Sequence, residues 1–231
     1  MATALAVQEQ RLAVLASDTS DDSPIVTRVV FNRGTYKPGI ERLRVVRRQN
    51  TVNNVAAQVA LNIALIALTR GAAVQGFSKD DLAGDEMPEL ANDPVSANPA
   101  SQDVANGLGR MATRFYARRA IEAVAVAKTD GSTPEEIADA SQIPKDLGTA
   151  LNPTGWQLVY ESIASGDDLY RLKFGAQLGR TFKGPVVCGY VSEPLGWAAW
   201  QADGWQHLRE ERAKAVTRCT ADLGAYIAAN W

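Results

Sequence analysis

The hydrophobic and polar positions in the last third of the chain predict a small antiparallel sheet. Strand-like runs cover residues 156–163, 169–178 and 185–191, with turn-forming sequence between them. In the middle run, Leu172 and Phe174 alternate with Lys173 and its polar neighbours, so one face is apolar and the other is polar. Short turns between such runs are typical of an antiparallel meander, and its apolar face must be covered by another element.

The closing segment predicts a long helix that can cover this face. Apolar residues recur at helical spacing from 205 to 226, whereas Glu211 and Lys214 fall on the opposite side. Cys219 lies on the apolar stripe and Cys188 lies in the third strand-like run. Packing the helix on the sheet would bring the two sulfur atoms together, so we predict a disulfide between them. Two buried free thiols are the alternative.

The N-terminal part predicts further strands and a basic surface. Runs 5–15, 25–31 and 40–48 are expected to form a second small sheet. Between 24 and 50 there are seven basic residues and a single acid, Glu41, so this is the most basic part of the chain. A solvated strand face would explain these charges, and so would a contact surface for a protein partner with an acidic surface. We predict the contact surface at Arg42, Arg44, Arg47 and Arg48.

The middle of the chain predicts two helices separated by a long loop. Residues 51–69 carry no charge and place a narrow amide stripe on an apolar cylinder, which favours a buried helix. Residues 78–103 contain seven acids and several prolines, which favours an irregular loop that is sensitive to proteases. This loop is also a candidate for covering the arginines from within the molecule. Residues 104–127 have the apolar spacing of a second helix.

The segment 133–151 predicts two short helices, with Thr133 as the N-cap of the first and Ile143-Pro144 as the turn. With the helix before it and the hairpin after it, this segment resembles the helix-turn-helix half of winged-helix regulators. The resemblance implies DNA binding through residues 104–178. A recognition helix needs basic side chains to meet phosphates, and this one offers Lys145 beside Asp146. We therefore keep DNA binding as an alternative and expect no nucleic-acid partner.

Composition narrows the classes of function. The chain has 231 residues, of which 46% are hydrophobic and 22% charged, and its net charge of -2 gives no general attraction to nucleic acid. It contains no apolar run long enough to cross a membrane and no recognisable signal peptide. A periplasmic or secreted mature form is favoured by the predicted disulfide, with a removed leader or a lipid anchor left open. A cytoplasmic location is the alternative.

The residues that could support catalysis are few. His207 is the single histidine, and Glu211 one turn later favours a surface ion pair. The sequence lacks the spacings of zinc sites, phosphate-binding loops and nucleophile elbows. We therefore predict no catalytic residue, no metal and no cofactor. Trp197, Trp200 and Trp205 are expected to close a core, and stacking on a ligand is the alternative.

Together these patterns predict a single α+β domain over 1–231. A three-stranded antiparallel meander is packed by a long C-terminal helix, with an N-terminal strand layer and two further helices. The expected function is that of a non-enzymatic binding protein of a bacterial-type cell envelope that engages a macromolecule. Such a protein would be an inhibitor, an immunity-type partner or an accessory factor. A winged-helix DNA-binding regulator and an unrecognised hydrolase are the alternatives.

Overall fold

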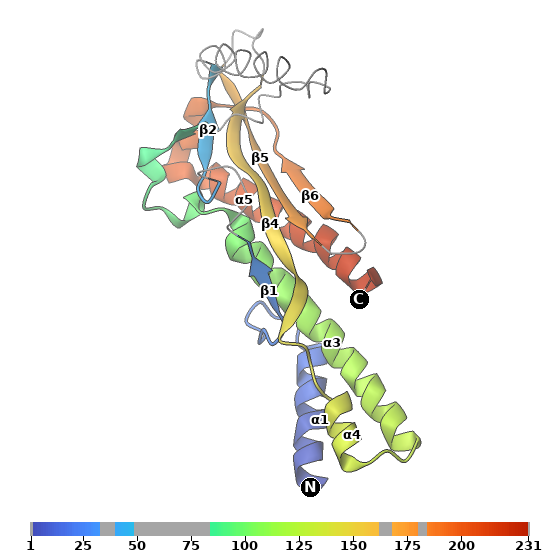
Figure 1. Cartoon of the computed structure of the whole chain (residues 1–231). Coiled ribbons are helices and arrows are strands. Elements are labelled where there is room, and N and C mark those ends of the chain that lie inside the picture. The colour runs from blue at the N-terminus through green and yellow to red at the C-terminus, as the bar shows by residue number, and fades with distance from the viewer. Residues whose placement is uncertain (1, 33–39, 49–83, 162–167, 180–183, 231) are drawn as a thin grey trace, which may run out of the picture.

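The computed structural model describes residues 2–32, 40–48, 84–161, 168–179 and 184–230, and it confirms the α+β class. A mixed sheet and helix α5 form one end of an elongated molecule, and α1, α4 and the second half of α3 form a helical lobe at the other (Figure 1). The predicted helix at 51–69 lies outside the described residues. The described elements are α1 (Ala2–Ser17), β1 (Arg28–Phe31), β2 (Arg44–Val46), β3 (Asp85–Glu86), the 3-10 turns η2 (Pro88–Leu90), η3 (Pro94–Ser96) and η4 (Pro99–Ser101), α3 (Asp103–Thr129), α4 (Pro134–Ala140), β4 (Asp146–Tyr160), β5 (Leu169–Leu178), β6 (Val186–Val191), β7 (Leu195–Gly196) and α5 (Trp197–Asn230).

The sheet contains the predicted meander, because β4, β5 and β6 pair antiparallel in sequence order. The prediction of a second, N-terminal sheet is wrong. Strands β1 and β2 both pair parallel with β4, β1 along its first half and β2 along its second half. This is possible because β4 is 15 residues long and one of its edges is left open by the meander. All described strands therefore belong to one sheet.

The predicted strand at 5–15 is part of helix α1. Its sequence is rich in alanine, leucine and glutamine, which favour a helix, and it has few β-branched residues. Leu12 and Leu15 are buried against Ala117 and Ala120 of α3, and together they form a small core separate from the main one. The helical lobe is therefore built by packing α1 along the second half of α3.

The helix-turn-helix prediction is half right. Helix α4 is present, and Thr133 caps it in a capping box with Glu136. The second helix is absent, because residues from Asp146 onward form β4 and pair with β1. An isolated short helix gains little without an apolar face to bury, whereas this segment completes a sheet edge. The recognition helix on which the DNA-binding alternative depends is therefore missing.

Helix α5 lies across one face of the sheet and is joined to it at Cys188 of β6 and Cys219 (Figure 1). Their sulfur atoms are 2.15 Å apart, which is a disulfide distance, as predicted. The first turns of α5 are separated from the rest by a break at Ala202–Trp205. Trp200 before the break is fully buried and donates its indole N–H to the Tyr170 carbonyl at 3.1 Å. The core role predicted for this tryptophan is confirmed.

Helices α3 and α5 approach each other closely where glycine replaces a side chain. A Cβ atom built on Gly107 of α3 would lie 2.8 Å from the Thr220 methyl carbon of α5. A Cβ atom on Gly224 of α5 would lie 2.2 Å from the Met111 methyl carbon of α3. The two glycines therefore allow α3 to lie close beside α5. Helix α3 then extends away from the sheet into the helical lobe (Figure 1).

The described part of the predicted loop, residues 84–103, is packed into the core rather than loosely exposed. Its prolines open three successive 3-10 turns, and Leu90, Val95 and Ala100 are buried. Trp156 of β4 donates its indole N–H to the Ser96 carbonyl at 2.9 Å. The expectation that this stretch has little to bury is therefore wrong, because Leu90, Val95 and Ala100 enter the core, while Asp93 and Asp103 pair with arginines of α5.

Candidate functional site

The strongest candidate for a binding site is an apolar groove in the helical lobe, which we call the α1/α4 groove. It encloses about 590 Å³ and lies between one side of α1 and one side of α4. Its apolar lining includes Leu5, Ile137 and Ala138, and Gln8 and Gln142 add polar side chains. Its lining consists of Ala4, Leu5, Gln8, Pro134, Glu135, Ile137, Ala138, Ser141 and Gln142.

Local sequence explains the shape of this groove. Thr133 and Pro134 fix the start of α4, and Ile137 on its inner face is buried. Because α4 is only 7 residues long, it covers α1 over a short distance. The small Ala4 and Ala138 side chains leave space that larger residues would fill. Folding thus leaves an apolar hollow between two helices.

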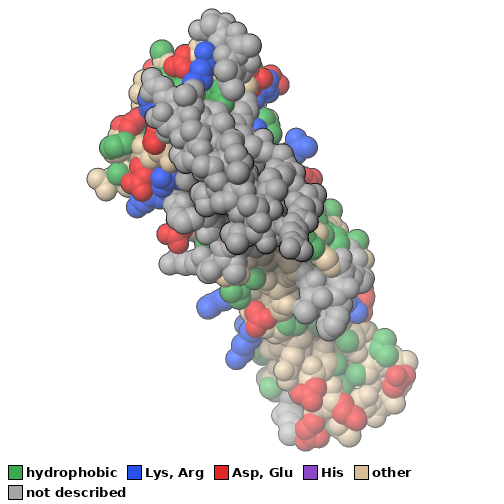
Figure 2. Space-filling model, turned by 45° about the horizontal axis from the view of Figure 1, so that its top comes forward, with side chains coloured by type: hydrophobic (Ala, Val, Ile, Leu, Met, Phe, Trp, Pro, Cys, Tyr) green, Lys and Arg blue, Asp and Glu red, His purple; other side chains and the backbone are tan. Residues whose placement is uncertain are grey.

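The walls of the α1/α4 groove carry negative charge. Among the described residues 4–11 and 134–142 there are four acids, Glu9, Glu135, Glu136 and Asp139, and one base, Arg11, which is exposed on α1 one turn after Gln8. Glu9 pairs with Lys128 of α3, whereas the three acids of α4 are exposed. Figure 2 shows acidic side chains gathered at the lower end of the molecule, where the lobe lies. The groove is therefore apolar inside and acidic at its rim.

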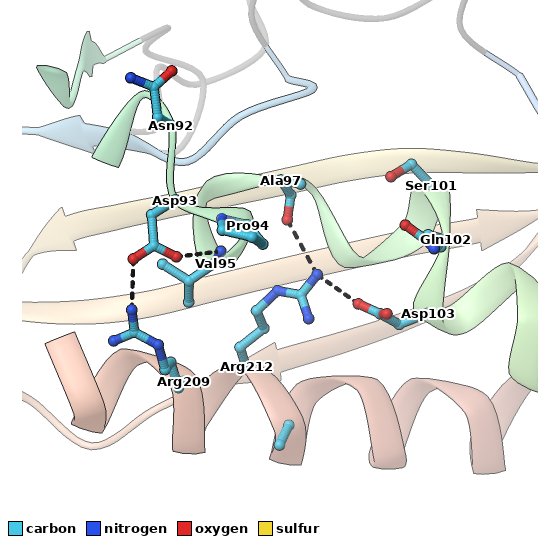
Figure 3. A pocket seen from close by; sticks show the side chains of 11 residues that line it. Asn92, Asp93, Pro94, Val95, Ala97, Ser101, Gln102, Asp103, Arg209 and Arg212 are labelled. Carbon is cyan, nitrogen blue, oxygen red and sulfur yellow. Dashed lines mark hydrogen bonds and ion pairs between the residues drawn. The ribbon is translucent and has the colours of Figure 1, made fainter. Parts of the chain in front are cut away.

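A second hollow, the α5 cleft, lies between α5 and the 92–103 segment and has a volume of about 850 Å³. Its charged side chains face one another (Figure 3). Arg209 and Asp93 are 2.5 Å apart, and Arg212 and Asp103 are also 2.5 Å apart. These ion pairs attach the segment to α5 and neutralise each other. The α5 cleft is therefore accounted for by the packing of the 92–103 segment against α5.

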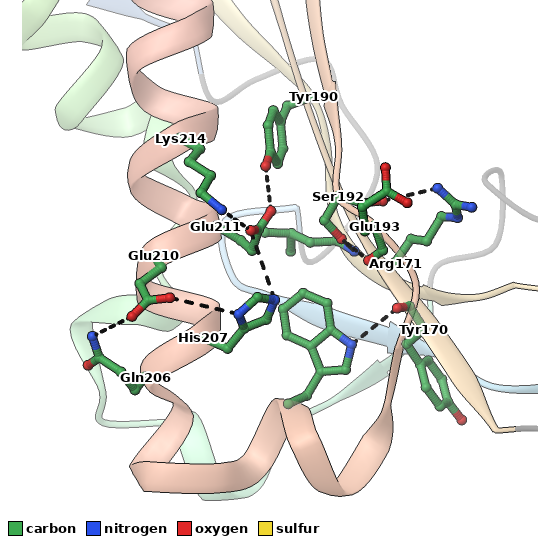
Figure 4. Close-up of polar contacts among 12 residues, drawn as sticks. Tyr170, Arg171, Tyr190, Ser192, Glu193, Gln206, His207, Glu210, Glu211 and Lys214 are labelled. Carbon is green, nitrogen blue, oxygen red and sulfur yellow. Dashed lines mark hydrogen bonds and ion pairs between the residues drawn. The ribbon is translucent and has the colours of Figure 1, made fainter.

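A buried polar cluster surrounds Glu211, which the sequence placed on the outer face of the last helix. The structure corrects this, because Glu211 lies one turn before Ala215 on the inner stripe and its side chain is only 6% exposed. Tyr190 of β6 donates its hydroxyl to one carboxylate oxygen, and Lys214 Nζ lies 2.6 Å from the other (Figure 4). His207 Nε2 lies 3.9 Å from the same carboxylate, while its ring packs on Trp200.

These contacts set the protonation of the cluster. Burial alone would raise the pKa of the Glu211 carboxyl, but hydrogen bonds from Lys214 and Tyr190 outweigh it and lower the pKa. Burial raises the pKa of the Tyr190 phenol to about 12, and its hydrogen bond to Glu211 acts in the same direction. The carboxylate is thus ionised, and the groups directed at it stabilise it between α5 and β6. His207 is part of this cluster through its contacts with Glu211 and Trp200.

The predicted partner-binding arginines lie near the upper end of the sheet and make internal contacts. Arg44 donates to the Gly84 carbonyl at 2.9 and 3.1 Å and pairs with Glu86 at 3.3 Å. Arg42 donates to the Ser96 hydroxyl at 3.3 Å and to the Ala91 carbonyl. Residues 84–96 therefore hold both arginines by hydrogen bonds, while Arg42 stays exposed and Arg44 is half-buried.

The other two arginines are placed differently. The Arg47 guanidinium lies 4.9 Å from the centre of the Trp197 ring, and the residue is exposed. Arg48 is half-buried at the end of the described segment. Contact with an acidic partner through these four residues stays a prediction, and Arg47 is the member best placed for it.

The α1/α4 groove was missed because residues 5–15 were assigned to a strand. The signal was present, since Leu5, Leu12 and Leu15 recur at helical spacing on one face of a segment made of strong helix formers. Among the described residues, no cluster of His, Cys, Asp or Glu side chains is arranged to hold a metal ion. No described helix has an apolar stretch sufficient to cross a bilayer.

Comparisons of the chain with protein-family models, with curated proteins and with solved structures found no match. The function proposed below therefore depends on the residues and geometry of this chain.

Proposed function

We propose that this protein is a non-enzymatic binding protein of an oxidising compartment, such as a bacterial-type cell envelope, and that it engages a macromolecular partner through the α1/α4 groove. The observation that carries the proposal is the apolar hollow of about 590 Å³ between Leu5 on α1 and Ile137 on α4. An inhibitor, an immunity-type partner or an accessory factor could engage its target in this way.

An unfilled apolar groove favours binding because close packing is the rule inside proteins. A hollow of this volume falls in the range of known ligand sites, roughly 300 to 1,000 Å³, and apolar side chains from a partner would fill it. Every apolar atom that the partner covers leaves water, which contributes about 25 cal/mol per Å². The helical lobe projects beyond the sheet, so a partner can reach the groove without contacting the sheet (Figure 1).

The compartment is supported by the disulfide between Cys188 and Cys219, which account for both cysteines of the chain. Disulfides persist in secreted and periplasmic proteins and are rare in the cytosol. The polar groups at the sheet end support binding over catalysis. In the Glu211 cluster, and separately in the α5 cleft, the charged side chains are paired with one another.

Site-specific photo-crosslinking in the organism that makes the protein tests this proposal. A crosslinker placed at Gln142, in the groove, is expected to trap a discrete partner in the envelope fraction. The same crosslinker at Ala123, on an exposed face of α3 outside the groove, is the matched control. The proposal is overturned if both positions give the same products. It is also overturned if the protein fractionates with the cytosol with both thiols free.

A further inference from the structure

We infer that the occupant of the α1/α4 groove is an amphipathic helix of the partner whose polar face is basic. This inference rests on the proposed function and adds the chemistry of the bound segment. It follows from three features of the lobe: the apolar lining, the exposed acids along α4 and the shape left between two helices.

The charge of the rim selects among the apolar ligands that would fit. Glu135 lies in the lining itself, and Glu136 and Asp139 are exposed beside it. Described residues 134–142 contain no base, and the facing helix α1 carries one, Arg11, so the described rim keeps an excess of acids. A fatty acid or an anionic membrane surface would bring negative charge against these carboxylates and be repelled. Lysine or arginine side chains flanking an apolar stripe would be attracted.

The geometry favours a helical segment over an extended one. The groove runs between helices, so it exposes side chains and offers no strand edge with free backbone N–H and C=O groups. An isolated extended segment would leave its backbone groups unpaired on an apolar surface. A helix satisfies its own backbone and inserts side chains at i, i+3 or i+4 and i+7. Val7, which is 63% exposed and one turn from Ala4, extends the apolar surface beyond the groove.

A set of synthetic peptides tests the inference with purified protein. Each peptide has about 14 residues, or four helical turns, with leucines at the same helical spacing. The polar positions are lysine in one peptide, glutamine in the second and glutamate in the third. Fluorescence anisotropy at low salt is expected to give at least about tenfold tighter binding of the lysine peptide than of the glutamate peptide. Added salt should reduce this difference.

Three variants locate the binding. Ala138→Lys places a base and a long side chain in the groove, and it should weaken binding of the lysine peptide about tenfold. Ala123→Lys adds the same group to an exposed position of α3 and should leave binding unchanged. The double change Glu135→Lys and Asp139→Lys should reverse the peptide preference. Glu136 is kept because its side chain closes the capping box of α4.

Each other occupant gives a distinct result. Equal binding of all three peptides overturns the inference that the bound helix is basic. The proposed function stays in place if crosslinking from Gln142 still traps a partner. If the protein binds vesicles of anionic lipid and none of the peptides, the groove contacts a membrane surface and the inference is overturned. A dimer in sedimentation analysis that Ala138→Lys dissociates shows a second copy of this chain. Loss of the Gln142 crosslink together with retained peptide selectivity overturns the proposed function alone.

Discussion

Removal of the disulfide between Cys188 and Cys219 should cost a large part of the stability of the sheet end. The two cysteines are separated by 31 residues in sequence. Closing a loop of this length reduces the entropy of the unfolded chain by an amount worth roughly 3.7 kcal/mol at 25 °C. In a protein of this size, a loss of about 1 kcal/mol lowers the melting temperature by roughly 2–4 °C. The double variant Cys188→Ala and Cys219→Ala should therefore melt about 7–15 °C below the wild type.

The assay compares thermal unfolding by circular dichroism in the presence and absence of a reductant. Reduction should lower the melting temperature of the wild type toward that of the double variant. The double variant itself should not respond to the reductant, which controls for general effects of the reagent. Titration of thiols in the unfolded, unreduced protein should find none. A wild type that keeps its melting temperature on reduction would refute the reasoning, because α5 and β6 would then not depend on the covalent link.

Three further predictions follow from the contacts of single residues. Glu211→Gln should lower stability by about 2 kcal/mol at neutral pH, because a buried ionised acceptor is lost. Because the pKa of Glu211 is lowered in the folded protein, the stability lost in this variant is fully present above pH 4.5, the ordinary pKa of a glutamate side chain, and shrinks as the pH falls. A loss of stability that does not change with pH would contradict this origin. Arg44→Glu should destabilise the protein by roughly 2 kcal/mol in urea unfolding, because two hydrogen bonds and an ion pair are lost. Arg47→Glu should cost less than about 1 kcal/mol and is the better probe of an acidic partner; equal effects of the two changes would argue against these placements. Gly107→Leu should destabilise by roughly 1–3 kcal/mol because α3 and α5 are in close contact there, whereas Ala123→Leu on the exposed face should be neutral by the same measurement.

The sequence by itself determined the elements whose signals are local. The meander was visible because alternation of apolar and polar residues and turn-forming sequence both repeat over a few residues. Helix α4 was visible because Thr133 and Glu136 form a capping box at a fixed spacing. The pairing of Cys188 with Cys219 followed from the faces on which the two residues lie, since those faces had to meet in the core.

Only the tertiary structure decided how distant segments share an edge or a face. Strands β1 and β2 join β4 because its edge is open, and no local pattern in 28–31 or 44–46 specifies that partner. Glu211 is buried because Tyr190 and Lys214 are positioned to stabilise its charge, whereas charge alone predicts an exposed residue. The α1/α4 groove exists because two helices far apart in sequence leave a gap between small side chains. Such a gap depends on how the helices pack against α3, so it appears only when the whole chain has folded.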